Sequence, residues 1–208
     1  MSLIKRKVGR KSIRETRQRE IVEAFYIVAQ KEGLENASIA KVAKVLDINP
    51  SLIIHYFDTR EELLFELIEY ILSKYRLIYN FEDHAIDSRQ KLISIIDNLF
   101  SHQWGNLVDD SVFYSCYALV FRSPKIRSRF KKLHDVLHQW LCDHLQEAQS
   151  HQVISIDNPE QTANLIFVIL DGAYYYLGMV EDKEEYEQTI CRYKQVALNL
   201  LGLSQDTY

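Results

Sequence analysis

The sequence is poor in the residues that form turns and disulfide bonds. Its 208 residues include only six Gly, three Pro and three Cys. So few turn formers leave little for the hairpins of a β-rich fold, whereas the abundant Leu, Ile, Glu and Lys favour helices. The cysteines are odd in number and none forms a CxxC pair, which indicates reduced thiols. These shortages predict an all-α fold.

Long apolar runs are also lacking. The longest spans residues 165–170, far short of the roughly 20 residues that cross a bilayer. The basic N-terminal end is not followed by the apolar segment of a secretory signal. We therefore expect a cytoplasmic protein with no membrane-spanning helix.

The two signs of charge are unevenly distributed around a net charge of −4. Residues 1–60 carry 12 Lys and Arg against 7 Asp and Glu, or +5, and residues 61–208 carry 13 against 22, or −9. A basic end on an acidic body indicates a module that binds a polyanion, with a solvated tail as the alternative. We expect a DNA-binding arm over residues 1–14, with the cationic side chains Lys5, Arg6, Lys7, Arg10 and Lys11.

Apolar spacing and capping residues predict a cluster of short helices after this arm. A helix over residues 15–32 is followed by Gly33, which suits a left-handed end. Ser38 is a plausible N-cap of a second, short helix. A tight turn through Asp47 then leads to a third helix over residues 50–56, with Asn49 as its N-cap and Pro50 as its first residue. A capping box formed by Thr59 and Glu62 starts a fourth helix, which extends to about residue 80.

Two short helices joined by a tight turn and supported by an earlier helix form a helix-turn-helix DNA reader. We expect this three-helix domain over residues 15–58, with helix 50–56 in the major groove and helix 59–80 as the connection that follows. Leu52 is placed to meet a thymine methyl group and His55 to hydrogen-bond a base edge, although a surface histidine is the alternative. The side chains left outside the predicted core are the candidates for DNA contact: Ser38, Lys41, Asn49, Ser51, Leu52, His55, Tyr56 and Arg60.

The stretch from Ile39 through Leu64 resembles the DNA-binding signature of the TetR (tetracycline-repressor-like) family of bacterial transcriptional regulators. Segments 39–43, 47–49, 55–57 and 59–63 carry the resemblance, which covers roughly residues 15–68. It implies that Asn49, His55 and Tyr56 touch DNA and that Arg60 lies where a lysine commonly binds phosphate. Asp47 replaces the usual turn glycine, and Pro50, Leu52 and Ile54 depart from the family's commoner residues, which leaves the operator sequence open.

The remainder, residues 81–208, continues in blocks of apolar helical spacing. Plausible helix starts are Asp87 or Ser88, Ser123-Pro124 and Asp157-Asn158-Pro159. With these blocks the chain has about nine helices. We expect this C-terminal helical bundle to serve ligand binding and dimerisation.

Segment 165–170 is apolar on every face, so it is buried in a core, at a subunit interface, or in both. The resemblance implies that the last two long helices form a four-helix interface in a homodimer, with the core of a monomer as the alternative. A homodimer places two recognition helices roughly 34–36 Å apart and therefore binds a near-palindromic double-stranded operator. The expected interface residues are Leu165, Ile166, Ile169, Tyr193, Val196 and Leu200.

Aromatic residues gather between residues 100 and 180 at helical spacing. Most fill the core, yet together they could enclose an apolar pocket with a few polar groups. The resemblance implies a small apolar or amphipathic effector whose binding releases the DNA. The candidate pocket residues are Trp104, Phe113, Tyr117, Phe121, His138, Phe167, Tyr174 and Tyr175.

No pattern indicates a catalytic, cofactor or metal site. His134, His138 and Cys142 span eight residues, or about 12 Å of helix, too far for three ligands of one zinc ion. Phosphate-binding loops and the GxSxG and HExxH motifs are missing. The sequence therefore predicts a dimeric TetR-like repressor that joins the nucleoid when it binds DNA. Two alternatives stay open: a DNA-binding regulator without an effector, and a helical ligand-binding or protein-binding module that has lost DNA recognition.

Overall fold

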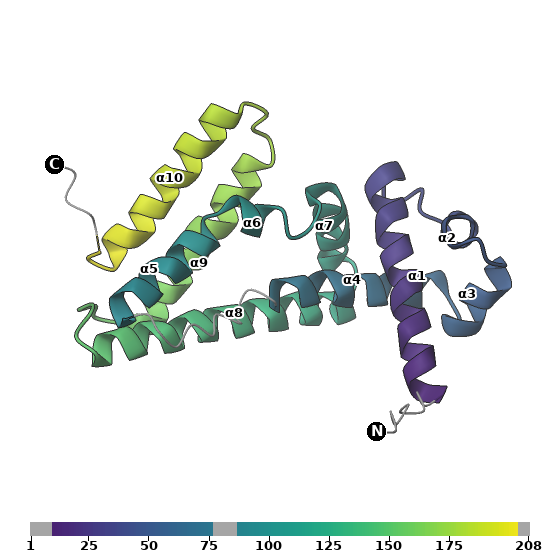
Figure 1. The fold of residues 1–208 in the computed structure, drawn as a ribbon, viewed down its shortest axis with the longest axis horizontal. Helices are drawn as coiled ribbons and strands as arrows, with labels where there is room; N and C mark the ends of the chain where they lie inside the picture. Colours follow the sequence, from purple (N-terminus) through teal and green to yellow (C-terminus); the bar gives the residue numbers. More distant parts are fainter. Residues whose placement is uncertain (1–9, 77–86, 204–208) are drawn as a thin grey trace, which may run out of the picture. The chain divides into compact units, whose positions relative to one another are not determined.

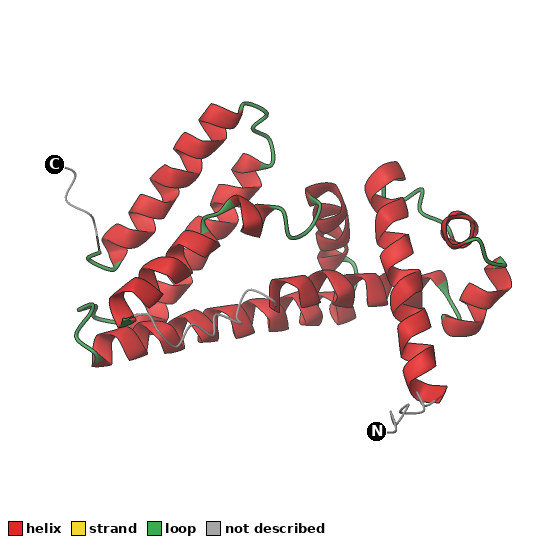
Figure 2. Cartoon of the chain, in the orientation of Figure 1, coloured by secondary structure: helices red, strands yellow, loops and turns green. Residues whose placement is uncertain are grey.

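The computed structural model describes residues 10–76 and 87–203, and none of these residues lies in a β-strand (Figure 2). The predicted all-α fold is confirmed. The described residues form ten α-helices and a short 3-10 helix, against the expected total of about nine. The additional α-helix is α6 (His102–Gly105), which is too short to show helical periodicity in a sequence.

The chain divides into two compact units, and each is described by itself. Unit 1 consists of residues 1–75 and 108–130, and unit 2 of residues 76–107 and 131–208. Residues 108–130 thus belong to the same compact unit as the N-terminal helices, although they are far from them in the sequence.

Unit 1 contains α1 (Arg10–Glu32), α2 (Ile39–Leu46), α3 (Pro50–Tyr56), α4 (Arg60–Arg76), α7 (Asp110–Tyr117), the 3-10 helix Ala118–Phe121 and the first turns of α8 (Pro124–Ser150). Helix α1 packs against α2, α3 and α7, and α2 and α3 lie together on one side of it (Figure 1). The core between these helices includes the fully buried side chains of Phe25, Val42, Ile53 and Phe57.

Helix α1 begins five residues earlier than residue 15, where the sequence places it. Residues 10–14 lack Gly and Pro, so nothing in them stops the helix. Arg10 and Lys11 of the expected arm therefore lie in a helix, whereas Lys5, Arg6 and Lys7 lie outside the described residues. The expected continuation of α4 to about residue 80 also lies outside them.

The predicted turns and caps of unit 1 are confirmed. Gly33 ends α1 with a φ of +84°, and Asp47 ends α2 in the left-handed region with a φ of +53°. The Asn49 side chain caps α3, which has Pro50 in its first turn. At the start of α4, the Glu62 amide donates to Thr59 Oγ1 at 3.1 Å.

The capping box at α4 differs from the predicted one in a single hydrogen bond. Glu62 Oε2 accepts from the amide of Asp58, at 2.9 Å, instead of from that of Thr59. The glutamate side chain thus reaches one residue beyond the N-cap and satisfies an amide of the preceding turn.

Unit 2 contains α5 (Ser88–Leu99), α6, the remainder of α8, α9 (Pro159–Leu177) and α10 (Lys183–Leu200). Asp87 caps α5 and Asn158 caps α9, as their positions in the sequence predict. Helices α9 and α10 form an antiparallel hairpin, and α10 also packs against α5 (Figure 1).

The left-handed turn at Asp47 supports a test of the helix-turn-helix geometry. A β-branched side chain is strained in this region, so Asp47→Val should lower the free energy of unfolding by about 1–2 kcal/mol. Asp47→Gly should be at least as stable as the native protein. Urea denaturation measures both variants, and equal stability of the valine variant would contradict the left-handed turn.

Candidate nucleic-acid interface

Helix α3 has one anchored face and one exposed face. Ile53 is fully buried, and Tyr56 is half-buried with its backbone carbonyl accepting from Gln18 Nε2 of α1 at 3.4 Å. Ser51, Leu52, Ile54 and His55 are exposed. The single buried isoleucine therefore determines which side chains of α3 point away from the protein.

Asn49 and Ser51 are bonded to each other at the start of α3. Asn49 Oδ1 accepts from the Ser51 amide at 2.9 Å and from Ser51 Oγ at 2.8 Å. Both were predicted to contact DNA. The structure shows that the asparagine oxygen and the serine proton already serve the helix cap.

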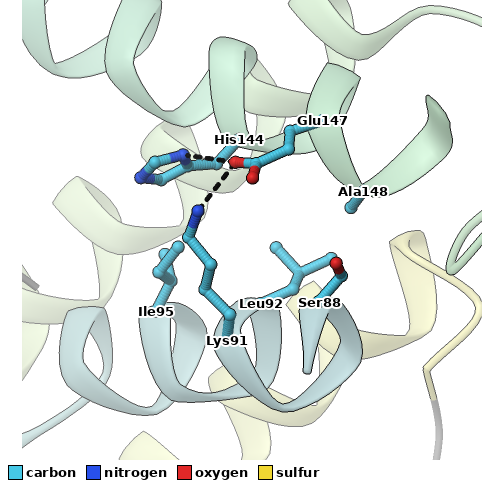
Figure 3. Close-up of a pocket in the computed structure, with 7 residues that line it drawn as sticks. All are labelled: Ser88, Lys91, Leu92, Ile95, His144, Glu147 and Ala148. Atoms are coloured by element: carbon cyan, nitrogen blue, oxygen red, sulfur yellow. Dashed lines mark hydrogen bonds and ion pairs between the residues drawn. The ribbon is translucent and has the colours of Figure 1, made fainter. Parts of the chain in front are cut away.

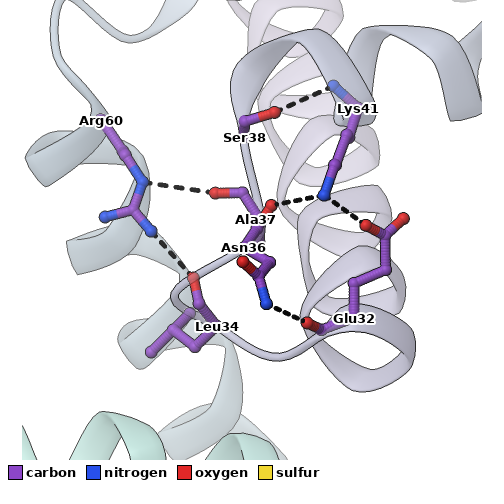
Figure 4. Close-up of polar contacts among 7 residues, drawn as sticks. All are labelled: Glu32, Leu34, Asn36, Ala37, Ser38, Lys41 and Arg60. Atoms are coloured by element: carbon purple, nitrogen blue, oxygen red, sulfur yellow. Dashed lines mark hydrogen bonds and ion pairs between the residues drawn. The ribbon is translucent and has the colours of Figure 1, made fainter.

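The start of α2 holds Ser38 and Lys41 in a similar local network (Figure 4). Ser38 Oγ accepts from the amide of Lys41 at 3.4 Å. The Lys41 ammonium donates to the carbonyl of Asn36 at 3.0 Å and forms an ion pair with Glu32. Lys41, predicted to contact DNA, thus has two partners within the protein.

Arg60 connects the start of α4 to the loop between α1 and α2 (Figure 4). Its Nη2 donates to the carbonyl of Leu34 at 2.8 Å, and its Nε donates to that of Ala37 at 3.3 Å. A guanidinium has five N–H donors, so these bonds leave others for a phosphate. The sequence contains no signal for this clamp, because its acceptors are backbone carbonyls of residues distant in the chain.

A second polar link joins α1 to the start of α7. The Asp109 amide donates to the hydroxyl of Tyr26 at 2.7 Å, and Gln30 Nε2 donates to Asp109 Oδ2 at 3.2 Å. Burial opposes ionisation of Asp109, but hydrogen bonds from Ser111, Gln30 and the Val112 amide outweigh it and lower the carboxyl pKa. Asp109, the N-cap of α7, is therefore held as a carboxylate next to α1.

The predicted effector residues fall into the two units. In unit 1, the Phe113 and Tyr117 rings lie 5.9 and 5.5 Å from that of Phe130, centroid to centroid, and Phe121 is 72% exposed. The rings of Phe113, Tyr117 and Phe130 therefore form an aromatic cluster, which the exposed Phe121 contacts through Tyr117.

In unit 2, His138 stacks on Phe167 with centroids 4.6 Å apart, and burial is the main cause that lowers its pKa. The Tyr174 hydroxyl lies within hydrogen-bond distance of the carbonyls of residues 99 and 101. Trp104 is buried, whereas Tyr175 is exposed. The effector site as a whole stays a prediction.

One pocket of unit 2 lies between α5 and α8 and has charged walls (Figure 3). Lys91 Nζ donates to Glu147 Oε2 at 2.7 Å, and His144 Nδ1 lies 3.6 Å from the same oxygen. Burial and the nearby lysine lower the pKa of His144. None of the predicted effector residues lines this pocket.

Within residues 10–76 and 87–203, no group of three His, Cys, Asp or Glu side chains could hold a metal ion. The same part of the chain contains no helix long and apolar enough to cross a membrane.

The outer face of the α9–α10 hairpin carries exposed apolar side chains. Leu165, Val196 and Leu200 of the expected interface are exposed, and Ile169 and Tyr193 are half-buried. The expectation that Ile166 lies at the interface is corrected here, because its side chain is fully buried in the core of its own unit and cannot face a partner. Val168, which the sequence does not single out, is 66% exposed on the same helix. In a segment that is apolar throughout, the sequence does not distinguish the inner face from the outer one.

Comparisons with known proteins agree with this architecture. Residues 19–67 match the family described as bacterial regulatory proteins, tetR family. Residues 87–203, more than half of the chain, match the tetracyclin repressor-like C-terminal domain. The transcriptional regulator UidR of Escherichia coli K12 is 24% identical over 172 residues, which cover 79% of this chain and 81% of UidR.

Solved structures show the same fold. A TetR transcription regulator from Haloarcula marismortui has a TM-score of 0.78 at 18% identity, covering 91% of this chain and 98% of its own. A transcriptional regulator from Saccharomonospora viridis, solved in complex with choline, has a TM-score of 0.72 at 16% identity, covering 90% and 96% of the two chains. With both of its family regions matched in order, the chain belongs to the TetR family of transcriptional regulators.

Proposed function

We propose that this regulator is a homodimeric repressor that binds a near-palindromic double-stranded operator and leaves it when a small effector binds. The observation that carries the proposal is α3, which is anchored by Ile53 and presents its other side outward directly after the left-handed turn at Asp47. An exposed second helix of a helix-turn-helix is the element that enters the major groove.

We assign the DNA contacts from the hydrogen-bonding groups and exposed side chains that are not engaged by other residues of the protein. The N-termini of α2 and α3 offer amides to phosphate oxygens near their caps, Ser38 and Asn49. Leu52, His55 and Tyr56 are assigned to the groove. Lys41 and Arg60 support the loop before α2 and also add positive charge near the phosphates.

The same proposal divides the chain by role. The basic side chains of residues 1–14, which include the start of α1, contact phosphates, and residues 15–58 form the reader. Residues 59–80 form the connection, and residues 81–208 bind the effector and the second subunit. The charge of +5 on residues 1–60 supports the placement of DNA at this end.

The partner of the exposed α9–α10 face is a second copy of the chain. Val168, Leu165 and Val196 expose apolar surface there, and contiguous apolar surface of this kind marks an interface. A dimer also presents two copies of α3 to one operator.

The effector is a small apolar or amphipathic molecule. Aromatic side chains within both units support this class of ligand, as does His138, whose pKa is lowered by burial and whose ring stacks on Phe167. The choline bound by the Saccharomonospora viridis regulator shows that a protein of this fold can hold a small molecule.

Selection of random double-stranded DNA at about 0.15 M salt, followed by sequencing, tests the proposal. We expect a palindrome to be enriched by a particle of twice the 24.5 kDa of one chain. Tyr56→Ala should weaken binding to this palindrome about 5- to 150-fold without unfolding the protein, as a lost base or phosphate contact at both half-sites costs about 1–3 kcal/mol in all. Weak, salt-sensitive binding with no enriched sequence would instead favour a helical module without DNA recognition.

The Arg60 clamp has its own test. Arg60→Ala removes both bonds to the α1–α2 loop and should lower the free energy of unfolding by about 1 kcal/mol, together with operator affinity. Arg60→Lys keeps the charge but cannot span both carbonyls, so it should lose nearly as much.

Urea denaturation and operator titration measure both variants. Lys31→Ala, which removes an exposed positive charge from α1, is the matched control. Native affinity and stability in Arg60→Lys would show that only the charge matters, and would reject the clamp.

The exposed face of α9 predicts the effect of a charge at the subunit interface. Val168→Glu should leave each chain folded but produce monomers, because a carboxylate would be buried without a partner. Operator affinity should then fall at least a hundredfold, since the two half-sites are no longer bound by one particle.

Light scattering measures the mass of each variant in solution and so distinguishes monomers from dimers. Val136→Glu on α8, where the native valine is also exposed, is the control and should remain dimeric. A dimeric Val168→Glu variant would refute this placement of the interface.

A further inference from the structure

Helix α3 lacks the side chains that usually read purines. Its sequence, PSLIIHY, contains no Arg, Lys, Asn or Gln. These four residue types make the common two-bond contacts to guanine and adenine in the major groove. If α3 enters the groove, it recognises bases by other means.

Its remaining polar side chains have limited capacity for base readout. Ser51 donates its hydroxyl proton to Asn49 Oδ1, and that oxygen also accepts the Ser51 amide. Tyr56 is half-buried. His55 is thus the exposed side chain of α3 with hydrogen-bonding groups that the cap does not engage.

Two aliphatic side chains occupy the rest of the exposed surface. Leu52 is 38% exposed and Ile54 is 50% exposed. They precede and follow the buried Ile53, so each lies roughly 100° around the helix axis from it. Both therefore flank the outward face at which Ser51 and His55 are centred.

The major groove offers such side chains one apolar group, the C5-methyl group of thymine. We propose, resting on the DNA-binding function proposed above, that Leu52 and Ile54 determine specificity by contacting thymine methyl groups in each half-site. The operator then carries thymine at the positions that face these side chains, and guanine contacts contribute little to recognition.

The experiment uses the full-length protein and the palindrome obtained by selection. Each thymine of a half-site is replaced in turn by deoxyuridine, which removes the methyl group and keeps the base pair and the phosphate. At one or two positions, affinity should fall about three- to fivefold for each methyl group removed. Replacing thymine at these positions by cytosine should also weaken binding, and 5-methylcytosine should recover part of the loss.

Two variants assign the methyl contacts to residues. Leu52→Ala and Ile54→Ala keep a good helix former at exposed positions, and each should bind thymine and deoxyuridine operators equally at the position that its side chain reads. Ile27→Ala on α1, where the native isoleucine is 39% exposed, is the matched control and should keep the native preference for thymine.

The outcomes separate the two proposals. If selection enriches no sequence, the DNA-binding function itself fails. If a palindrome is enriched but deoxyuridine is tolerated at every position, only the methyl readout fails. A preference for thymine that persists in both alanine variants would assign it to other residues and overturn the inference. Unchanged operator affinity in both variants would also overturn it and would leave the two side chains as surface for a protein partner.

Discussion

The burial of Ile53 is the constraint on which the DNA reader depends. A helix of seven residues is not stable alone in water. Its orientation comes from one fully buried side chain, from the left-handed residue Asp47 before it and from the packing of Phe57 after it. These three features determine which side chains of α3 lie outside the protein.

Two polar links tie the reader to neighbouring helices within unit 1. Arg60 holds the carbonyls of the α1–α2 loop to the start of α4. The Asp109–Tyr26 bond holds α1 to the start of α7. A rearrangement of α4 or α7 would have to break these bonds or move α1 and the α1–α2 loop with it. Their partners are backbone groups or a carboxylate that serves as a helix cap, so each link also stabilises the local fold.

Much of the reader could be predicted from the sequence because its signals are local. Ser38, Asn49 and Thr59 accept hydrogen bonds from amides two or three residues ahead, and the periodicity of each helix is visible within its own segment. The buried and exposed faces of α9 were harder to predict. Ile166 and Val168 have similar chemistry and stand two residues apart, yet one is buried and the other exposed. The short helix α6 was missed because four residues contain too little periodicity.

The sequence by itself determined the helical class, the helix-turn-helix, its caps and the uneven distribution of charge. These properties depend on backbone propensities, on bonds between near neighbours and on the sum of charges, none of which requires a distant contact. The tertiary structure alone decided that Arg60 bonds to backbone carbonyls of the α1–α2 loop, that Ile166 faces inward, and that Ile54 remains exposed on α3. Each of these depends on which residues from remote segments meet in space, because packing determines which hydrogen-bond partners and apolar surfaces are left exposed.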